Sequence, residues 1–245
     1  MNLFRPRFND GPKDGDVMEV DGLRVRLKVN RRARRISLRI DPTRGEAVAV
    51  APSPRRLSEA VSFAKERAGW AAERLAAHPQ KRPFAPGTYA PLRGRPALLA
   101  AVPNASAARL VEDEGEIVIV SGGEGEAFAR RVENLLRREA LKDLTERTAC
   151  HARALGLKVP RTAIGDPKSR WGSCTPQRGS IRYSWRLVLA PPAVLDYVAA
   201  HEVAHLVHAD HSPRFWAVVK GLVGPRLEGR AWLKANGGEL HAIGR

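Results

Sequence analysis

Four of the seven histidines in this chain fall between positions 201 and 211, and their spacing restricts how that segment can fold. His201 and His205 belong to the sequence HEVAH, so on an α-helix they lie one turn apart on the same face. Two imidazoles placed in this way can bind one metal ion. Glu202 follows the first histidine, where its carboxylate can reach a water on that ion and accept its proton. This HExxH pattern predicts a helix that carries a metal site and a general base.

A third protein ligand would complete such a site and leave one position open for water. His211 is the leading candidate, because it follows the motif closely and directly precedes Ser212 and Pro213. Serine at an N-cap with proline at the first helical position is typical of a helix start. We therefore expect the first helix to end near Ala209 and a second to begin at Pro213, with His211 in the turn between them.

Three further residues could contribute to this site. His208 is a weaker alternative ligand, since three consecutive ligands on one straight helix spread along its axis; it could also face the substrate. Asp196 and Asp210 could accept hydrogen bonds from ring N–H groups of the ligands, although a helix surface or a turn cap is the simpler interpretation. Three imidazoles with one open position suit zinc best, and such sites also accept nickel, cobalt or manganese.

The composition is that of a globular protein with a substantial core, since 43% of the 245 residues are hydrophobic and 28% are charged. The net charge of +16 suggests a polyanion nearby, either nucleic acid or an acidic protein substrate, or it serves solubility alone. Two cysteines are too few for a disulfide framework. No secretory signal is visible, and the apolar stretch at 97–102 is far too short to cross a bilayer. We therefore expect a cytoplasmic protein with no membrane partner.

The pattern of the first half predicts a flexible tail over 1–18 and a β-rich subdomain with one helix over 19–120. Period-two alternation predicts three strands that we interpret as an antiparallel meander, at 23–29, 36–40 and 47–50. A helix is expected over 57–77, followed by a Pro-rich connector over 78–94. Three further strands are expected at 97–102, 108–111 and 116–120, and a loop at 121–125 marks the predicted subdomain boundary.

The second half, 121–245, begins with a long helical pattern over 126–155. Two strand-like segments follow, at 158–164 and 180–190, and the helix with the histidines then opens at Pro191 and Pro192. No internal repeat is visible in the sequence. Together these elements predict an α+β fold.

Three blocks of this sequence resemble the YgjP-like metallopeptidases, which are relatives of the SprT-like and WLM zinc peptidases in the zincin superfamily. The blocks are RWGSC at 170–174, SWRLVLAP at 184–191 and HEVAHLVHADHSPRFW at 201–216. The resemblance extends over about 22–239. It implies a zincin-like catalytic half, made of a long helix, a small sheet and the motif helix, next to an N-terminal β-rich subdomain.

The resemblance also implies one zinc ion per chain held by His201, His205 and His211, with Glu202 as the catalytic general base and a protein or peptide as substrate. In zincins an edge strand beside the metal commonly holds an extended peptide. Four residues around such a strand are therefore candidates for substrate binding, unless the segment is a purely structural hairpin: Trp171, Gly172, Ser173 and Tyr183.

The group that stabilises the transition state is not evident from the sequence, and Tyr183, Tyr197 and Arg170 are candidates for that role. Two arginine clusters could be solvated surface or a phosphate-contacting face, one at 31–35 and one at 130–138. Three functional hypotheses follow: a zinc-dependent peptidase, a nucleic-acid-associated protease of SprT-like type, and a non-catalytic metal-binding module or a hydrolase of another amide.

Overall fold

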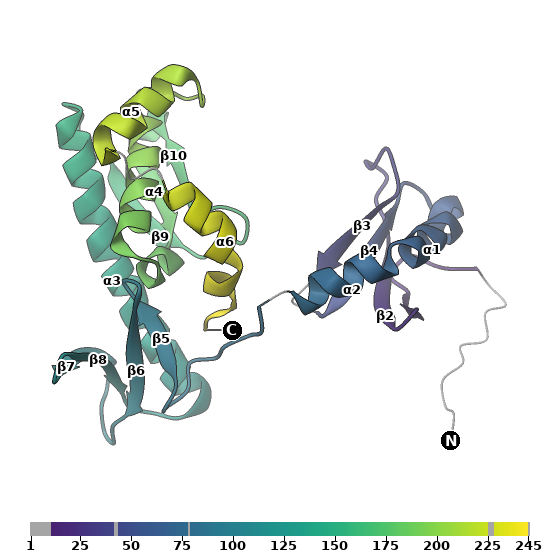
Figure 1. The fold of residues 1–245 in the computed structure, drawn as a ribbon, viewed down its shortest axis with the longest axis horizontal. Coiled ribbons are helices and arrows are strands. Elements are labelled where there is room, and N and C mark those ends of the chain that lie inside the picture. Colours follow the sequence, from purple (N-terminus) through teal and green to yellow (C-terminus); the bar gives the residue numbers. More distant parts are fainter. Residues whose placement is uncertain (1–10, 42–43, 78, 225–227, 245) are drawn as a thin grey trace. The chain divides into compact units, whose positions relative to one another are not determined.

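The computed structural model describes residues 11–41, 44–77, 79–224 and 228–244. The chain divides into two compact units, Met1–Pro79 and Gln80–Arg245, which are described separately below (Figure 1). Of the expected tail over 1–18, residues 1–10 lie outside the described part. The remainder is ordered by the sheet that follows: Val17 begins a strand, the Gly15 N–H donates to the Leu27 carbonyl, and the Val29 N–H donates to the Asp14 carboxylate.

The first unit is built on a four-stranded sheet of order β1-β2-β4-β3. Its strands are β1 (Val17–Val20), β2 (Leu23–Val29), β3 (Ser37–Asp41) and β4 (Glu46–Ala51). The predicted antiparallel meander is wrong in one respect, because β2 pairs with β4 in parallel and β3 lies outside β4. Alternation defines the two faces of a strand but not its neighbours, so the sequence pattern could not distinguish these arrangements.

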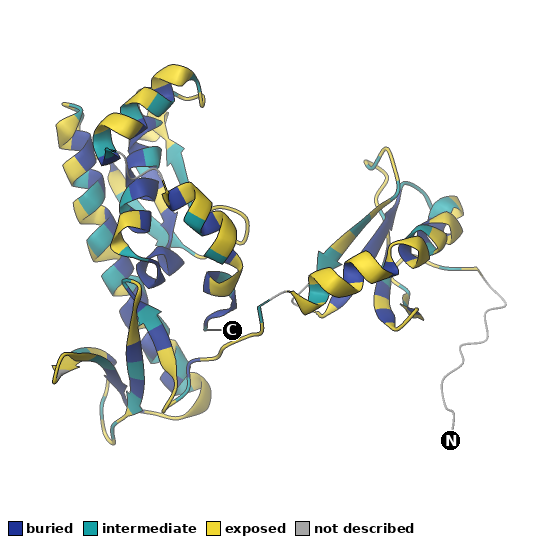
Figure 2. Ribbon diagram, in the orientation of Figure 1, coloured by how far each residue is buried: buried dark blue, intermediate teal, exposed yellow. Residues whose placement is uncertain are grey.

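The helical layer of this unit consists of the 3₁₀ turn η1 (Pro54–Arg56), α1 (Leu57–Glu66) and α2 (Ala68–Ala76). The single helix predicted over 57–77 is thus interrupted at Arg67, whose φ of −108° and ψ of 11° leave the helical region. Small buried alanines on both helices let them pack closely on the sheet (Figure 2). These alanines are Ala60, Ala64, Ala68 and Ala71.

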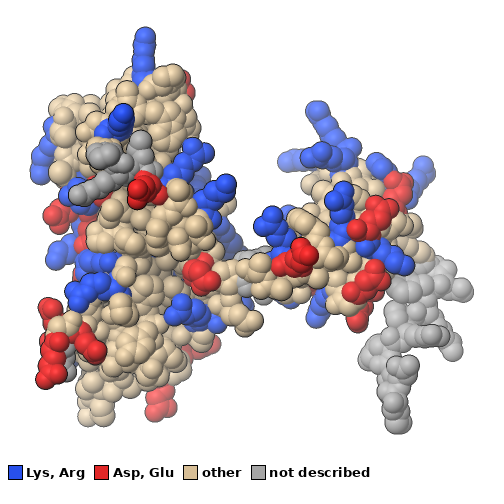
Figure 3. Space-filling model, in the orientation of Figure 1, with Lys and Arg blue, Asp and Glu red and all other residues tan. Residues whose placement is uncertain are grey.

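The turn between β2 and β3 carries four exposed arginines, Arg31, Arg32, Arg34 and Arg35. No ion pair or side-chain hydrogen bond of these arginines is found within the described residues. Figure 3 shows Lys and Arg side chains projecting from this unit into solvent.

The second unit opens with a sheet of order β5-β6-β8-β7, formed by β5 (Tyr89–Leu92), β6 (Arg95–Ala101), β7 (Arg109–Asp113) and β8 (Glu116–Ser121). It has the plan of the first sheet: the two outer pairs are antiparallel and the central pair is parallel. The three strands expected here are present, and β5 is an addition within the Pro-rich connector.

The long helix α3 (Gly125–Ala154) joins this sheet to the rest of the second unit. Phe128 and Leu136 on α3 share one hydrophobic core with Leu99 on β6 and Ile119 on β8. The division between units therefore falls at Pro79, whereas the sequence pattern placed it at the loop after β8.

A second sheet of order β10-β11-β9 supports the histidine segment, with β9 (Arg161–Gly165), β10 (Gly172–Thr175) and β11 (Ser180–Ser184). The 3₁₀ segments η2 (Pro176–Arg178) and η3 (Trp185–Leu189) flank β11, so only the first part of the strand predicted at 180–190 is extended. The helices α4 (Pro192–Ala204), α5 (Pro213–Val223) and α6 (Gly229–Ala242) follow. The described helices include none with the length and apolar character that a membrane span requires.

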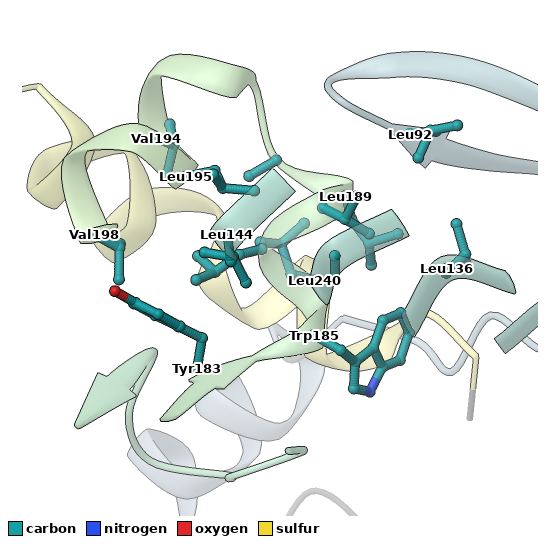
Figure 4. Close-up of a cluster of buried hydrophobic side chains, with 14 of the residues drawn as sticks. Leu92, Leu136, Leu144, Tyr183, Trp185, Leu189, Val194, Leu195, Val198 and Leu240 are labelled. Atoms are coloured by element: carbon teal, nitrogen blue, oxygen red, sulfur yellow. The ribbon is translucent and has the colours of Figure 1, made fainter. Parts of the chain in front are cut away.

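The core of this unit lies between α3, η3 and α4 (Figure 4). Polar contacts join α4 to α3 and η3 to the end of α6. Asp196 on α4 accepts hydrogen bonds from Arg147 Nε at 2.6 Å and bonds with His151 Nε2 at 2.7 Å, both on α3. The buried Arg186 on η3 donates to Asp166 and to the main-chain carbonyls of Leu240 and Ile243, which holds the end of α6 against η3.

Candidate metal centre

The helix α4 is held on nearly all sides, which fixes the side chains that it carries. Val194, Val198 and Val203 are buried, and so are both alanines that precede His201. His201 and Glu202 occupy the last turn of this helix. Both side chains therefore project from a rigid element rather than from a loop.

The chain leaves α4 earlier than expected, at Ala204 rather than near Ala209. After Ala204 the backbone forms a hydrogen bond between residues three apart rather than four, in which the Leu206 N–H donates to the Val203 carbonyl at 2.9 Å. The resulting turn brings the His208 carbonyl to 3.1 Å from His205 Nδ1. That nitrogen donates to the carbonyl, which leaves Nε2 of His205 free to face the other histidines.

His211 lies in the loop before α5, and α5 begins at Pro213 as the sequence predicted. The Ser212 hydroxyl accepts from the Phe215 N–H at 3.4 Å and caps the helix. Asp210 accepts from the Ser212 N–H and so has the capping role, while Asp196 is occupied by α3. Among the described residues, no hydrogen bond joins either aspartate side chain to a histidine of the candidate site.

The three predicted ligands His201, His205 and His211 come together, with one nitrogen from each lying within 4.8 Å of the others. The Nε2 atoms of His201 and His211 are 3.2 Å apart. Two nitrogens bound tetrahedrally to one zinc ion are separated by about 3.3 Å, given bonds of roughly 2.0–2.1 Å. The donor set therefore fits a metal ion, and His208 is not part of it.

The surroundings of His201 and His205 favour their neutral forms, whose ring nitrogens can donate an electron pair to a metal ion. Burial, followed by the charges of His205, His211 and Arg230, lowers the pKa of His201 to about 4. Burial likewise lowers the pKa of His205. The ring of Phe215 lies 4.6–4.9 Å from all three imidazoles and forms an apolar floor beneath them. Neutral imidazoles with converging lone pairs are what a metal ion requires.

Glu202 is buried beside the triad, with 6% of its surface exposed. Burial raises its pKa to about 7, against the opposing effect of the Arg170 charge. The main chain of Gly172 on β10 runs directly over this carboxylate, and a Cβ atom there would lie 2.4 Å from Glu202 Oε1. The glycine of the RWGSC block is thus explained by its close approach to Glu202.

A cleft of about 610 Å³ opens in front of these groups. Its lining includes His201, His211 and Glu202 from the candidate site, together with Trp171 and Gly172 from the sheet side. Another part of the wall is provided by α6, on which Trp171 packs by stacking against His241. The arrangement gives a substrate direct access to Glu202 and to the point where the histidine nitrogens meet.

The four candidates for substrate binding have different locations. Trp171 and Gly172 line the cleft, whereas Ser173 points to the other face of the sheet and lines a separate cavity with Arg182. Tyr183 is fully buried, its hydroxyl bonds with Thr148 Oγ1 at 2.9 Å, and burial raises its pKa (Figure 4). Neither side chain lines this cleft. Ser173 faces away because neighbouring residues of a strand face opposite sides, whereas Tyr183 pairs with Gly172 but is covered and bonded to α3. Their part in substrate binding stays a prediction.

Two of the three candidates for transition-state stabilisation line the cleft, and the buried Tyr183 does not. Tyr197 and Arg170 line the cleft, and the Tyr197 ring lies 6.1 Å from that of His201. Sequence reasoning missed the α6 wall, formed by Arg230, Leu233 and Lys234. The only local signal was the four-residue spacing of the two cations, which is common on exposed helices.

A family model described as "YgjP-like, metallopeptidase domain" matches residues 34–236. The chain belongs to the YgjP-like family. A search of curated proteins finds no match to it. The YgjP-like match begins before β3 and ends within α6, so it includes the triad, Glu202 and the residues of the α6 wall. Membership of this family makes the chain a metallopeptidase at the family level and implies a catalytic metal, which the histidine triad is able to bind.

Proposed function

We propose that this protein is a zinc-dependent peptidase with His201, His205 and His211 as the metal ligands. The observation that carries the proposal is the convergence of three imidazole nitrogens beside a buried glutamate at the wall of a cleft. Three neutral histidines and one open position are the ligand set typical of catalytic zinc. When bound, zinc supplies Lewis acidity, which polarises a peptide carbonyl and lowers the pKa of water toward neutrality.

Glu202 is the general base in this proposal. It neighbours His201 in sequence, lines the cleft, and is fixed by α4 on one side and by Gly172 on the other. A carboxylate held in this way can accept the proton of the attacking water and return it to the leaving amine. Its neighbours position the carboxylate and limit the water around it, so that it needs little reorganisation during the reaction.

The strand β10 is the proposed site for the substrate backbone. In the described part of the chain, the sheet order β10-β11-β9 leaves one side of β10 without a partner strand, and Gly172 at its start lies against Glu202. An extended peptide that adds to this edge would run beside the general base, with its main-chain groups paired to β10. This mode recognises the peptide main chain, while the cleft walls select side chains.

The decisive experiment compares the wild-type protein with Glu202→Gln. The amide keeps the shape of the carboxylate but cannot accept a proton, so we expect hydrolysis to fall by about 10²–10⁴-fold. Metal content should stay at one ion per chain, because the three histidines are unchanged. Cleavage is followed by mass spectrometry on a peptide library, and metal by elemental analysis.

Two outcomes of this comparison would contradict the proposal. Equal cleavage by both proteins would remove Glu202 from the reaction. Stoichiometric metal without cleavage by the wild-type protein would favour the non-catalytic metal-binding alternative.

A further inference from the structure

The cleft in front of the triad has a strongly positive lining. Arg230 and Lys234 are four residues apart on α6, so both project from the same side of that helix. They line the cleft on either side of Leu233, and Arg170 lines it from the segment before β10. Among the described lining residues Glu202 is the one acidic group, and the proposed reaction already employs it.

These three cations differ from several arginines elsewhere in the same unit. Arg93 pairs with Asp143 and Glu139, and Arg186 pairs with Asp166. By contrast, within the described ranges no carboxylate lies in ion-pair distance of Arg170, Arg230 or Lys234. The Arg230 guanidinium lies 5.9 Å from the ring centre of Trp216, another lining residue, so its charge is directed toward the cleft. An anionic group of a bound molecule would therefore be the first partner of opposite charge for these three cations.

Given the peptidase activity proposed above, we propose that the α6 wall selects peptides that present a carboxylate, with Arg230 and Lys234 as the specificity-determining residues. The carboxylate can come from a Glu or Asp side chain or from the C-terminus of the peptide. Leu233 and Trp216 contribute apolar surface to the same cleft, which suits the methylene groups of such a residue. The two cations provide charge-assisted hydrogen bonds that a neutral amide cannot replace at equal strength.

The test measures binding rather than cleavage. Metal-loaded Glu202→Gln protein is titrated with fluorescein-labelled decapeptides of neutral sequence, in which one position at a time carries Glu, Gln or Lys. Each peptide is made with a free and with an amidated C-terminus, so that the two sources of the carboxylate are separated. Fluorescence anisotropy gives the dissociation constant of each peptide.

We expect at least one Glu peptide, or the free-carboxylate series, to bind about tenfold more tightly than its neutral counterpart, since hydrogen bonds to charged groups have this magnitude. Adding R230A and K234A should abolish the difference, and R230E with K234E should reverse it in favour of Lys peptides. The matched control removes two exposed cations from α3, Arg130→Ala with Lys142→Ala, and should leave the preference unchanged. Because Arg230 and Lys234 are exposed, their variants should keep the circular dichroism spectrum and metal content of the parent.

Several results would overturn the inference: equal binding of Glu and Gln peptides in both series, no measurable binding of any peptide, or an equal loss of preference in the control. The outcome is separable from that of the proposed function. Cleavage by the wild-type protein without carboxylate preference would refute this inference alone. Carboxylate preference in binding without cleavage would refute the peptidase and leave the α6 wall as a recognition site.

Discussion

The contact between Gly172 and Glu202 joins two sequence blocks that lie about 30 residues apart. A side chain at position 172 has no space, since its Cβ would also lie 2.6 Å from Glu202 Cδ and Cγ. Glu202 is buried, so it can yield only by leaving the position from which it reaches the cleft. The smallest residue is therefore required at 172 for the orientation of the carboxylate.

This contact predicts the effect of Gly172→Ala. The methyl group should displace the Glu202 carboxylate and lower kcat/KM for peptide cleavage by about 100-fold, close to the loss of a general base. Metal stoichiometry should be unchanged, because Gly172 does not touch the histidines' ligand atoms. Steady-state kinetics and elemental analysis provide the two readouts.

The control is Gly221→Ala on α5, where a Cβ meets nothing within 4 Å. That variant should keep full activity and gain up to about 1 kcal/mol of stability from helix propensity. Unchanged activity of Gly172→Ala would show that Glu202 can work from a second position, contrary to our interpretation.

At the residue scale, the sequence was most informative for residues that lie close to one another along the chain. The triad and Glu202 lie within eleven consecutive positions, and helix geometry with a Ser-Pro helix start was sufficient to bring them together. Ser173 could not be placed, because an alternating strand has two possible inner faces. Tyr183 could not be placed either, because its burial depends on a tertiary contact with Thr148 on α3. Arg230 and Lys234 reach the cleft only through tertiary packing of α6, for which no nearby motif exists.

At the element scale, the pairing of α3 with α4 sets the position of the candidate site. Burial alone would raise the pKa of Asp196, but the hydrogen bonds with His151 and Arg147 outweigh this effect, and the pKa is lowered. A carboxyl group whose pKa is lower in the folded state stabilises the fold when ionised. Its contribution is present above the unfolded pKa of about 3.9 and is lost as the pH falls through the folded pKa.

Asp196→Asn should therefore destabilise the protein in a pH-dependent way. At pH 7 we expect a loss of about 1.5–3 kcal/mol in the free energy of unfolding, the usual range for hydrogen bonds to a charged group. The gap to wild type should narrow below about pH 4, where the wild-type carboxyl also becomes neutral. Urea denaturation at several pH values measures the difference in free energy of unfolding between variant and wild type. The exposed control Glu239→Gln should show no such difference. A gap that is constant with pH would contradict the ionic role of Asp196.

The same scale shows where element prediction fails. The helix α3 and the strands β2, β6 and β8 were predicted to within a few residues, because their periodicity is long or strict. The early end of α4 was not predicted, since the tightening after Ala204 depends on the bond between His205 and the His208 carbonyl. The parallel pairing of β2 with β4 was missed because pairing is a property of the sheet rather than of either strand.

At the scale of the whole molecule, the two arginine clusters differ in how many of their side chains already have partners within the protein. Arg131 and Arg138 on α3 donate to the carbonyls of Ala105 and Ala108, and Arg137 pairs with Glu133. Most of the α3 cluster is therefore engaged in packing. The exposed turn at 31–35 retains its charge for a partner, which makes it the better candidate for contact with nucleic acid.

We accordingly predict that any binding to duplex DNA is salt-dependent and requires the turn at 31–35. Replacing its four arginines by alanine should reduce the slope of log K against log salt by about 0.9 for each phosphate contact removed. Arg130→Ala on α3 is the single-charge comparison and should change the slope by no more than one such step. Titrations at two or more salt concentrations decide the matter, and absent or salt-insensitive binding would count against a nucleic-acid partner.

The two units also share a plan that no comparison of residues revealed. In each, two hairpins associate through a central parallel pair, and a helix follows in the chain. Strand order is determined by which hairpin edges meet, and many unrelated alternating sequences satisfy that requirement. An internal repeat can thus exist in topology while being invisible in sequence.

The hydrogen bonds of Arg186 have a consequence for the order in which the protein matures. Translation runs from the N-terminus, so the three histidines and Glu202 are synthesised before the carbonyl groups of Leu240 and Ile243 that anchor α6 to Arg186. Until those two carbonyls exist, Arg186 cannot hold the end of α6, the helix that carries the wall we expect to discriminate among peptides. The proposed selectivity therefore depends on an arginine that lies more than fifty residues before its partner in the chain.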